Sequence, residues 1–198
     1  MGEYQLQKME KKLRKYIDED RYNHTLGVMY TAASLAMSYD PELMERAQVA
    51  GLLHDCAKCI PNQKKLKLCV HYHISVSETE AKAPYLLHAP LGAAIAKDKY
   101  DIEDEEILSA IACHTTGKPG MTLLEKIIFV SDYIEPMRSK AENLAKIRQT
   151  AFSDIDFAVF LILRDTLIYL KDHTNLDNMT VVAYNYYKEL MEKREDFE

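Results

Sequence analysis

Hydrophobic residues recur along most of the chain at intervals of three and four residues, the spacing that places them on one face of a helix. Between residues 3 and 18 the positions of this kind are Leu6, Met9, Leu13, Tyr16 and Ile17. β-Branched residues do not alternate with polar residues over any extended stretch, and no Asn-Gly or Asp-Gly pair signals a hairpin. The pattern therefore predicts an all-α fold.

Helix boundaries follow from where this pattern starts and stops. We predict helices over residues 3–18, 21–39, 42–54, 88–97, 104–115, 121–136, 143–151, 154–171 and 178–194. Asp40 and Pro41 are typical of an N-cap followed by proline at the first helical position, and Ser77 with Glu80 has the capping-box pattern of a further short helix. The sequence contains no repeat, low-complexity tract or linker, so we expect a single domain over residues 1–198.

The composition fits a soluble globular protein: 198 residues, of which 47% are hydrophobic and 28% charged. The net charge of −6 argues against non-specific binding to nucleic acids or to an anionic membrane surface. The longest apolar runs, such as residues 157–163, are too short to span a bilayer. The N-terminus lacks a secretory pattern and the four cysteines lack the paired spacing of a zinc site, so we expect reduced thiols and a cytoplasmic location. Lys64, Lys65 and Lys67 are expected to form a solvated helix face.

The candidate chemistry centres on His54 and Asp55, which end an apolar run. An imidazole and a carboxylate are costly in an apolar core unless they are paired. A metal ion would resolve this conflict, because neutral imidazole and ionised carboxylate are natural ligands of iron, manganese and zinc. Two neighbouring residues cannot hold an ion alone, and further donors lie in separate helix-like segments: His24, His88, His114 and Asp132.

A single histidine on a helix is more often an ordinary hydrogen-bonded residue than a ligand. Here the histidines and aspartates lie in five ordered blocks: Arg21-Tyr22-x-His24-x-x-Gly27-Val28, Leu53-His54-Asp55-x-Ala57-Lys58, Leu87-His88-Ala89-Pro90-x-Gly92-Ala93, His114-Thr115-Thr116-Gly117 and Asp132-Tyr133-Ile134-Glu135-Pro136-x-Arg138. Together these blocks resemble the HD superfamily of metal-dependent phosphohydrolases. Within it, the chain is most similar to the bacterial YqeK-type symmetrical bis(5'-nucleosyl)-tetraphosphatases, from about residue 10 to residue 190.

The resemblance implies a helical HD-domain bundle with additional C-terminal helices, and an enzyme that splits diadenosine tetraphosphate into two ADP. It also implies His24, His54, Asp55 and Asp132 as metal ligands, iron as the metal with one or two ions bound, and a homodimer. The ligand types alone also suit manganese or zinc. Such an ion polarises a phosphoryl oxygen and lowers the pKa of its bound water, which makes hydroxide available near neutral pH.

The roles of His88 and His114 stay open between three alternatives. They could complete a second metal site bridged by Asp55, or donate hydrogen bonds to phosphate oxygens beside a single ion. They could also be buried histidines that bond only to backbone carbonyls. The scarcity of further carboxylates in the blocks favours phosphate contact. The candidate catalytic residues are Asp55, Lys58, His88 and His114, with Asp55 expected to orient the attacking water.

A tetraphosphate bridge carries several negative charges, so an acidic chain must supply local cations to bind it. Lys58 lies one helical turn after His54, Arg138 offers a bidentate fork, and Arg21 lies one turn before His24. Thr115 can add a hydroxyl or backbone donor. By resemblance, His173 belongs to a nucleotide-contacting loop, and the metal-binding and catalytic residues His24, Asp55, His88, His114 and Asp132 also border the substrate.

The leading prediction is therefore symmetrical hydrolysis of diadenosine tetraphosphate by metal-activated water. The alternatives are an HD phosphohydrolase acting on another nucleotide, a di-iron HD oxygenase with a similar ligand set, and a metal-binding nucleotide sensor without turnover. Product analysis over a nucleotide panel, oxygen consumption, and nucleotide binding without product formation distinguish these functions.

Overall fold

The computed structural model describes residues 4–171 and 177–195. These ranges contain eleven α-helices and no strand, which confirms the predicted all-α fold. In chain order the helices are α1 (Leu6–Leu13), α2 (Glu19–Tyr39), α3 (Met44–Leu53), α4 (Asn62–His71), α5 (Glu78–Lys82), α6 (His88–Tyr100), α7 (Glu105–Cys113), α8 (Leu123–Ile134), α9 (Leu144–Ala151), α10 (Ile155–Leu170) and α11 (Asn178–Glu195). Two short 3-10 helices, η1 (Pro41–Leu43) and η2 (Pro84–Leu87), precede α3 and α6.

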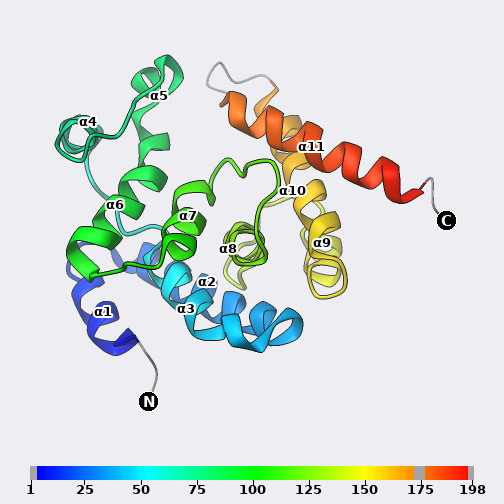
Figure 1. Cartoon of the computed structure of the whole chain (residues 1–198), viewed down its shortest axis with the longest axis horizontal. Coiled ribbons are helices and arrows are strands. Elements are labelled where there is room, and N and C mark those ends of the chain that lie inside the picture. Colours follow the sequence, from blue (N-terminus) through cyan, green and yellow to red (C-terminus); the bar gives the residue numbers. More distant parts are fainter. Residues whose placement is uncertain (1–3, 172–176, 196–198) are drawn as a thin grey trace.

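Helix α8 lies at the centre of the molecule (Figure 1). It packs against α2, α3 and α7 on one side and against α9 and α10 on the other. Its residues can occupy this place because most are apolar and buried, including Leu124, Ile127, Ile128 and Val130. Helix α6 packs on α7 and α11 packs on α10, farther from the centre. One apolar helix therefore joins the helices that precede it in the chain to those that follow it.

Local sequence signals fix where α2 and α8 begin. The Asp18 side chain caps α2 and accepts the backbone N–H of Arg21 at 2.8 Å. Thr122 and Glu125 form a capping box at the start of α8, in which each side chain accepts the backbone N–H of the other residue. These caps set the register of both helices, and with it the direction in which their polar side chains point.

A close approach between α2 and α3 depends on Gly51. A Cβ atom at this position would lie 2.9 Å from the Cα atom of Met29, which is shorter than an ordinary van der Waals contact. The glycine therefore lets the C-terminal turn of α3 rest directly on the backbone of α2. This contact brings the residues that follow α3 beside the middle of the molecule.

Most predicted helix ends agree with the structure to within a few residues. Two predictions differ from it, one of a helix end and one of the exposure of a side chain. The first predicted helix, residues 3–18, stops early: α1 ends at Leu13, and Asp18 adopts an extended backbone to cap the next helix. The prediction of a solvated lysine face on α4 holds for Lys64 and Lys67 but is wrong for Lys65. Lys65 is 3% exposed and its Nζ donates to the Lys58 carbonyl oxygen at 3.2 Å. Its long apolar stem allows this burial.

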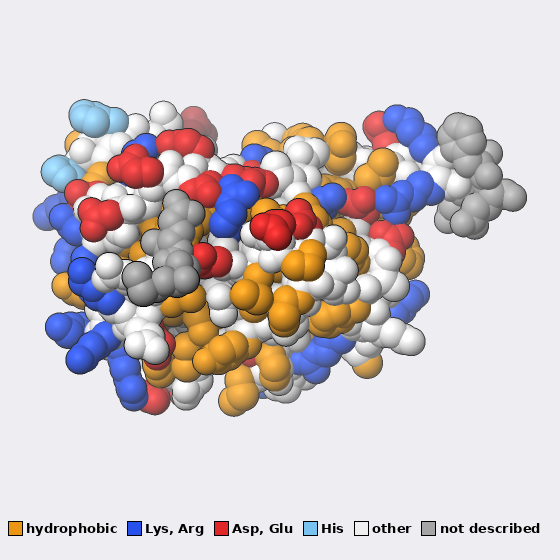
Figure 2. Space-filling model, turned by 60° about the horizontal axis from the view of Figure 1, so that its bottom comes forward, with side chains coloured by type: hydrophobic (Ala, Val, Ile, Leu, Met, Phe, Trp, Pro, Cys, Tyr) orange, Lys and Arg blue, Asp and Glu red, His pale blue; other side chains and the backbone are white. Residues whose placement is uncertain are grey.

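Charges of both signs are interspersed on the face shown in Figure 2, with hydrophobic side chains gathered between them. This mixture differs from the continuous basic stripe with which a protein binds nucleic-acid phosphates. None of the described helices has the length and hydropathy needed to cross a bilayer.

Candidate metal centre and active site

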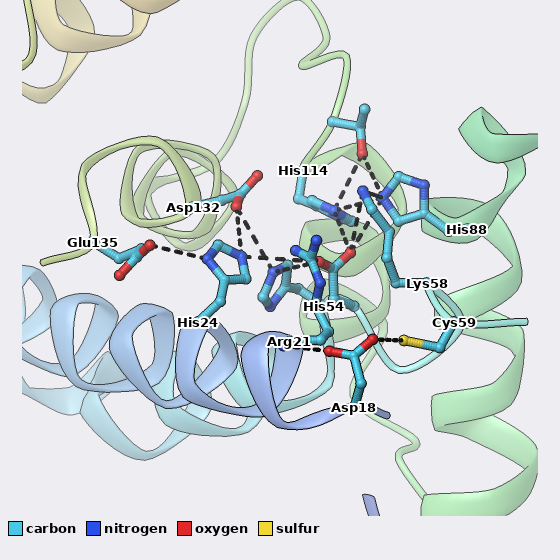
Figure 3. A network of polar contacts seen from close by, with 12 residues as sticks. Asp18, Arg21, His24, His54, Lys58, Cys59, His88, His114, Asp132 and Glu135 are labelled. Carbon is cyan, nitrogen blue, oxygen red and sulfur yellow. Dashed lines mark hydrogen bonds and ion pairs between the residues drawn. The ribbon is translucent and has the colours of Figure 1, made fainter. Parts of the chain in front are cut away.

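Four histidines and two aspartates converge at one place beside α8 (Figure 3). They come from separate elements: His24 from α2, His54 and Asp55 from the turn after α3, His88 from the first turn of α6, His114 from the end of α7 and Asp132 from α8. Neighbouring imidazole rings lie close, with centroid separations of 5.4 Å for His24–His54 and 5.0 Å for both His54–His114 and His88–His114. The fold thus brings together all six residues that the sequence motifs had singled out.

The backbone fixes the tautomer of three of these histidines. In each, Nδ1 lies within hydrogen-bond distance of the carbonyl oxygen three residues earlier: His54 to Gly51 at 2.7 Å, His88 to Tyr85 at 2.6 Å and His114 to Ile111 at 2.7 Å. A carbonyl oxygen can only accept, so Nδ1 carries the proton. In the neutral ring Nε2 then presents a lone pair to the centre of the cluster.

The first donor group consists of His24, His54, Asp132 and the Oδ2 atom of Asp55. The His24 Nε2 atom lies 3.1 Å from Asp132 Oδ1 without hydrogen-bond alignment, and His54 Nε2 lies 3.5 Å from Asp55 Oδ2. Both Nε2 atoms are buried and lack a hydrogen-bond partner. Donors that share one ion at about 2.1 Å lie about 3.0–3.4 Å apart in tetrahedral or octahedral coordination. Two further pairs, His24 Nε2 with Asp55 Oδ2 and His54 Nε2 with Asp132 Oδ1, are 3.9 Å apart. The shortest separations thus match donors that share an ion, and the donor types suit a metal.

The second donor group consists of His88, His114 and the Oδ1 atom of Asp55. Asp55 Oδ1 lies 3.3 Å from His88 Nε2 and 3.6 Å from His114 Nε2, and the two nitrogens are 3.2 Å apart. This group already contains a cation, because Lys58 Nζ lies 3.1 Å from His88 Nε2 and 3.7 Å from Asp55 Oδ1. The Thr115 hydroxyl lies 3.1 Å from both histidine nitrogens. Asp55 thus directs one oxygen toward each donor group.

Both aspartates are held in the ionised form. Burial alone would raise the pKa of Asp55, but the neighbouring His54 and Lys58 hold that pKa well below its usual range. Burial opposes ionisation of Asp132 as well, and the contacts with His24 and His54 outweigh it, so the pKa of Asp132 is also lowered. At neutral pH the cluster therefore contains two carboxylates that attract a cation.

The pKa values of His24 and His88 are shifted in opposite directions. Burial lowers the pKa of His24, but the carboxylates of Asp132 and Glu135 outweigh this effect and raise it overall. For His88, burial together with the nearby His114 and Lys58 lowers the pKa to about 3. His88 is therefore neutral at physiological pH, and its Nε2 atom accepts rather than donates.

Two arginines reach the aspartates from the solvent side. Arg21 Nη1 donates to Asp55 Oδ2 at 2.7 Å. Arg138 Nη2 donates to the backbone oxygen of Asp132 at 2.7 Å and to its Oδ1 atom at 3.2 Å. Both arginines line an open cleft of about 610 Å³ over His24. The same cleft is also lined by Lys140 and by the carboxylates of Asp18, Asp20 and Glu135, so it carries charges of both signs.

The positions of the remaining predicted site residues differ in detail. Lys58 lies in the turns after α3, not in a continued helix, yet its ammonium still points into the cluster. His173 lies outside the described residues, so its predicted nucleotide contact stays a prediction.

Two residues that contribute to the site had no predicted role. The Glu135 carboxylate contacts His24 Nδ1 at 3.1 Å, and Arg148 donates to the backbone carbonyls of Ile134, Glu135 and Arg138 at 2.7–3.0 Å. For Glu135 the sequence did contain a signal, because this residue lies in the same motif block as Asp132. No motif marks Arg148.

Comparison with known proteins identifies the protein family of this chain. A family model described as "HD domain" matches residues 21–137, which is more than half of the chain and includes all six converging residues. The chain belongs to the HD-domain family. The resemblance seen in the motif blocks is thereby confirmed at the level of the family.

Two relatives refine the comparison for this HD protein. It is 37% identical, over 87% of its length, to a Halalkalibacterium halodurans protein named bis(5'-nucleosyl)-tetraphosphatase, symmetrical, and covers 91% of that protein. A Staphylococcus aureus protein of the same name is 35% identical over 96% of this chain and 98% of its own length. These matches confirm the resemblance to the symmetrical tetraphosphatases.

A solved structure supports the same relationship. The fold matches the crystal structure of an HD superfamily hydrolase from Clostridium acetobutylicum, described as involved in NAD metabolism, with a TM-score of 0.89. The two sequences are 38% identical, and the match covers 95% of this chain and 99% of that one. The helices after α8 are therefore part of a fold shared with that hydrolase.

Proposed function

We propose that this HD protein hydrolyses diadenosine tetraphosphate symmetrically and releases two ADP. The observation that carries the proposal is the pair of buried, unbonded Nε2 atoms of His24 and His54 beside two ionised aspartates. This donor set suits a metal ion. It occurs in a chain whose similar relatives are named symmetrical bis(5'-nucleosyl)-tetraphosphatases.

In this proposal the first donor group holds one metal ion, with His24, His54, Asp132 and Asp55 as ligands. Iron is the metal that the family resemblance implies, and nitrogen and oxygen ligands of this kind also suit manganese and zinc. When bound, the ion supplies positive charge that stabilises a phosphoryl oxygen and lowers the pKa of a water molecule.

Asp55 is proposed to orient the attacking water. Its low pKa keeps it ionised, so it accepts a hydrogen bond from water over the whole neutral pH range. In the reaction, the water oxygen bonds to one of the two central phosphorus atoms. The bond between that phosphorus and the bridging oxygen breaks, and the bridging oxygen leaves with the other half of the substrate. The protons of the water pass to solvent, and two ADP result.

The second donor group is proposed to serve the phosphate side of the site. Because His88 is neutral and its Nδ1 atom carries the proton, its Nε2 atom accepts and does not donate to phosphate. The His88 ring holds the Lys58 ammonium, whose remaining N–H groups donate to phosphate. The single hydroxyl hydrogen of Thr115 bonds to the ring of His88 or His114. The alternative is a second ion between these rings and Asp55, which would use the same lone pairs and would displace Lys58.

Binding of the polyphosphate is proposed to use three cations around the cluster. Arg21 and Arg138 line the cleft over His24, and Lys58 lies beside His88 and Asp55. Each is already oriented by a carboxylate of the site, so little side-chain freedom is lost when phosphate binds. His173 is proposed to contact the nucleoside, as the family resemblance implies.

Product analysis tests this function. Metal-loaded protein incubated with diadenosine tetraphosphate should yield ADP as the sole nucleotide product, whereas AMP with ATP would refute the cleavage position. A panel of mono-, di- and triphosphates would identify another preferred nucleotide. Oxygen uptake without phosphate release would favour an oxygenase, and tight nucleotide binding without any product would favour a sensor. Metal analysis of the protein as purified, before any metal is added, decides between iron, manganese and zinc.

The proposal also includes a homodimer in the cytoplasm, as the family resemblance implies. Light scattering coupled to size-exclusion chromatography tests the dimer, and cell fractionation tests the location.

A further inference from the structure

One of the four histidines is oriented differently from the other three. His54, His88 and His114 lie at or next to helix ends, and each donates through Nδ1 to the carbonyl three residues earlier. His24 lies inside α2, where backbone carbonyls accept the N–H groups of the helix itself. Its Nδ1 atom therefore needs an acceptor from elsewhere in the fold, and it contacts Glu135 Oε1 at 3.1 Å.

Glu135 occupies a closely fitted place between α2 and the end of α8. The residue is 2% exposed, and its Oε2 atom accepts the backbone N–H of Met137 at 2.6 Å. A Cβ atom added to Gly27 would lie 2.6 Å from Oε2, so the carboxylate rests on a part of α2 that has no side chain. The two carboxylate oxygens are thus fixed by contacts with α2 and with the turn after α8.

The backbone of Glu135 is fixed as well. Arg148 Nη2 donates to the Glu135 carbonyl at 2.7 Å, and Arg148 Nε donates to the Ile134 carbonyl at 2.8 Å. These bonds satisfy carbonyl groups at the end of α8 that have no partner within the helix. They set the position of the Glu135 side chain, which follows α8 directly, relative to Asp132 in the last turn of that helix.

We propose that Glu135 is a positioning residue of the metal centre, whose carboxylate fixes the tautomer and orientation of His24 so that Nε2 faces Asp132 and the ion. The inference rests on the proposed metal site in the first donor group. Carboxylates that accept from the second nitrogen of a ligand histidine fix its ring and strengthen it as a ligand. Glu135 also links the ligand on α2 to the ligand on α8.

The test uses Co²⁺ as a probe, because its visible absorption reports the ligand set. Affinity for Co²⁺ is measured by competition with a chelator for the native chain, Glu135→Gln and Glu135→Ala. We expect about 10-fold weaker binding for Glu135→Gln, whose amide oxygen can still accept from Nδ1, and about 100-fold weaker binding for Glu135→Ala. The matched control is Glu189→Gln, an exposed charge on α11, which should bind as the native chain does.

A second variant displaces Glu135 without changing it. Gly27→Ala adds a methyl group against the flexible end of the Glu135 side chain, so the carboxylate should move while the helices stay in place. Gly27→Ala should therefore weaken Co²⁺ binding in the native chain and have no further effect in the Glu135→Ala background. Such non-additivity is the signature of two changes that act through one contact.

The outcomes separate a positioning role from a purely structural one. Weaker Co²⁺ binding with an altered absorption spectrum, in variants whose metal-free forms unfold at native temperatures, supports the inference. Native-like Co²⁺ affinity in Glu135→Ala overturns it, as does a lower unfolding temperature of the metal-free variants with unchanged affinity. A native chain that binds Co²⁺ and leaves diadenosine tetraphosphate intact refutes the proposed reaction alone. A native chain that binds no Co²⁺ refutes both.

Discussion

Replacing Lys58 by methionine should let a second metal ion bind. In the native chain the Lys58 ammonium lies 3.1 Å from His88 Nε2 and 3.7 Å from Asp55 Oδ1, among the lone pairs that a second ion would use. Methionine has a similar length and apolar stem but no charge. Lys58→Met therefore removes the competing cation while the donor atoms of His88, His114 and Asp55 remain.

The size of the effect follows from the charge separation. Two unit charges 3.7 Å apart interact by about 4 kcal/mol at an effective dielectric constant of 20 and by about 1 kcal/mol in water. The Lys58 side chain is 36% exposed, so solvent screening reduces the first figure, and about 2 kcal/mol is a reasonable value. Removal of this competition should strengthen binding of a second ion by roughly 30-fold.

Metal titration followed by elemental analysis measures the stoichiometry directly. We expect one Co²⁺ per native chain and two per Lys58→Met chain, whereas Lys64→Met, which changes an exposed lysine on α4, should remain at one. Two ions of equal affinity in the native chain would refute the view that Lys58 occupies the second donor group. A Lys58→Met chain that still binds one ion would show that His88 and His114 do not form a metal site.

Three further outcomes are expected. The pKa of His88 is lowered to about 3 from a usual value of 6.5, so its neutral ring contributes stability that is complete above pH 6.5 and is lost as the pH falls toward 3. In metal-free protein, His88→Gln should therefore reduce the pH dependence of the urea midpoint over this interval, and an unchanged dependence would contradict the assignment. Arg148→Ala removes the side-chain donor of three carbonyls, although that of Glu135 keeps the Arg138 N–H at 3.0 Å. The loss costs about 3 kcal/mol and should lower Tm by roughly 6–12 °C in calorimetry, and a shift under 2 °C would speak against this role. Gly51→Ala places a methyl group 2.9 Å from the Met29 Cα atom. It should cost about 1–3 kcal/mol in urea unfolding, and native stability would show that α2 and α3 separate freely.

The helical fold was predictable because its signals are local. Each helix shows its apolar face within its own sequence, and side chains such as Asp18 and Thr122 mark where helices begin. The cluster was predictable for a related reason. His54 and Asp55 are polar residues at the end of an apolar segment that is expected to be buried. Polar residues in such places are found mostly at functional sites.

Contacts between distant helices were not predictable from these signals. The contact between His24 and Glu135 joins residues 111 positions apart, and it depends on the angle at which α2 crosses α8. The burial of Lys65 depends in the same way on how α4 covers the turn that contains Lys58. The tautomers of His88 and His114 follow from their Nδ1 contacts, which appear only once the backbone around each helix end is placed.

His54 and His114 each find the partner that orients their ring within their own helix end, because Nδ1 bonds to the carbonyl three residues earlier. Such a helix end could be transferred to another helical scaffold, and the direction of Nε2 would be kept without any added supporting residue. His24 offers no such portability, since moving it would require two helices and the turn after the second to be carried along together.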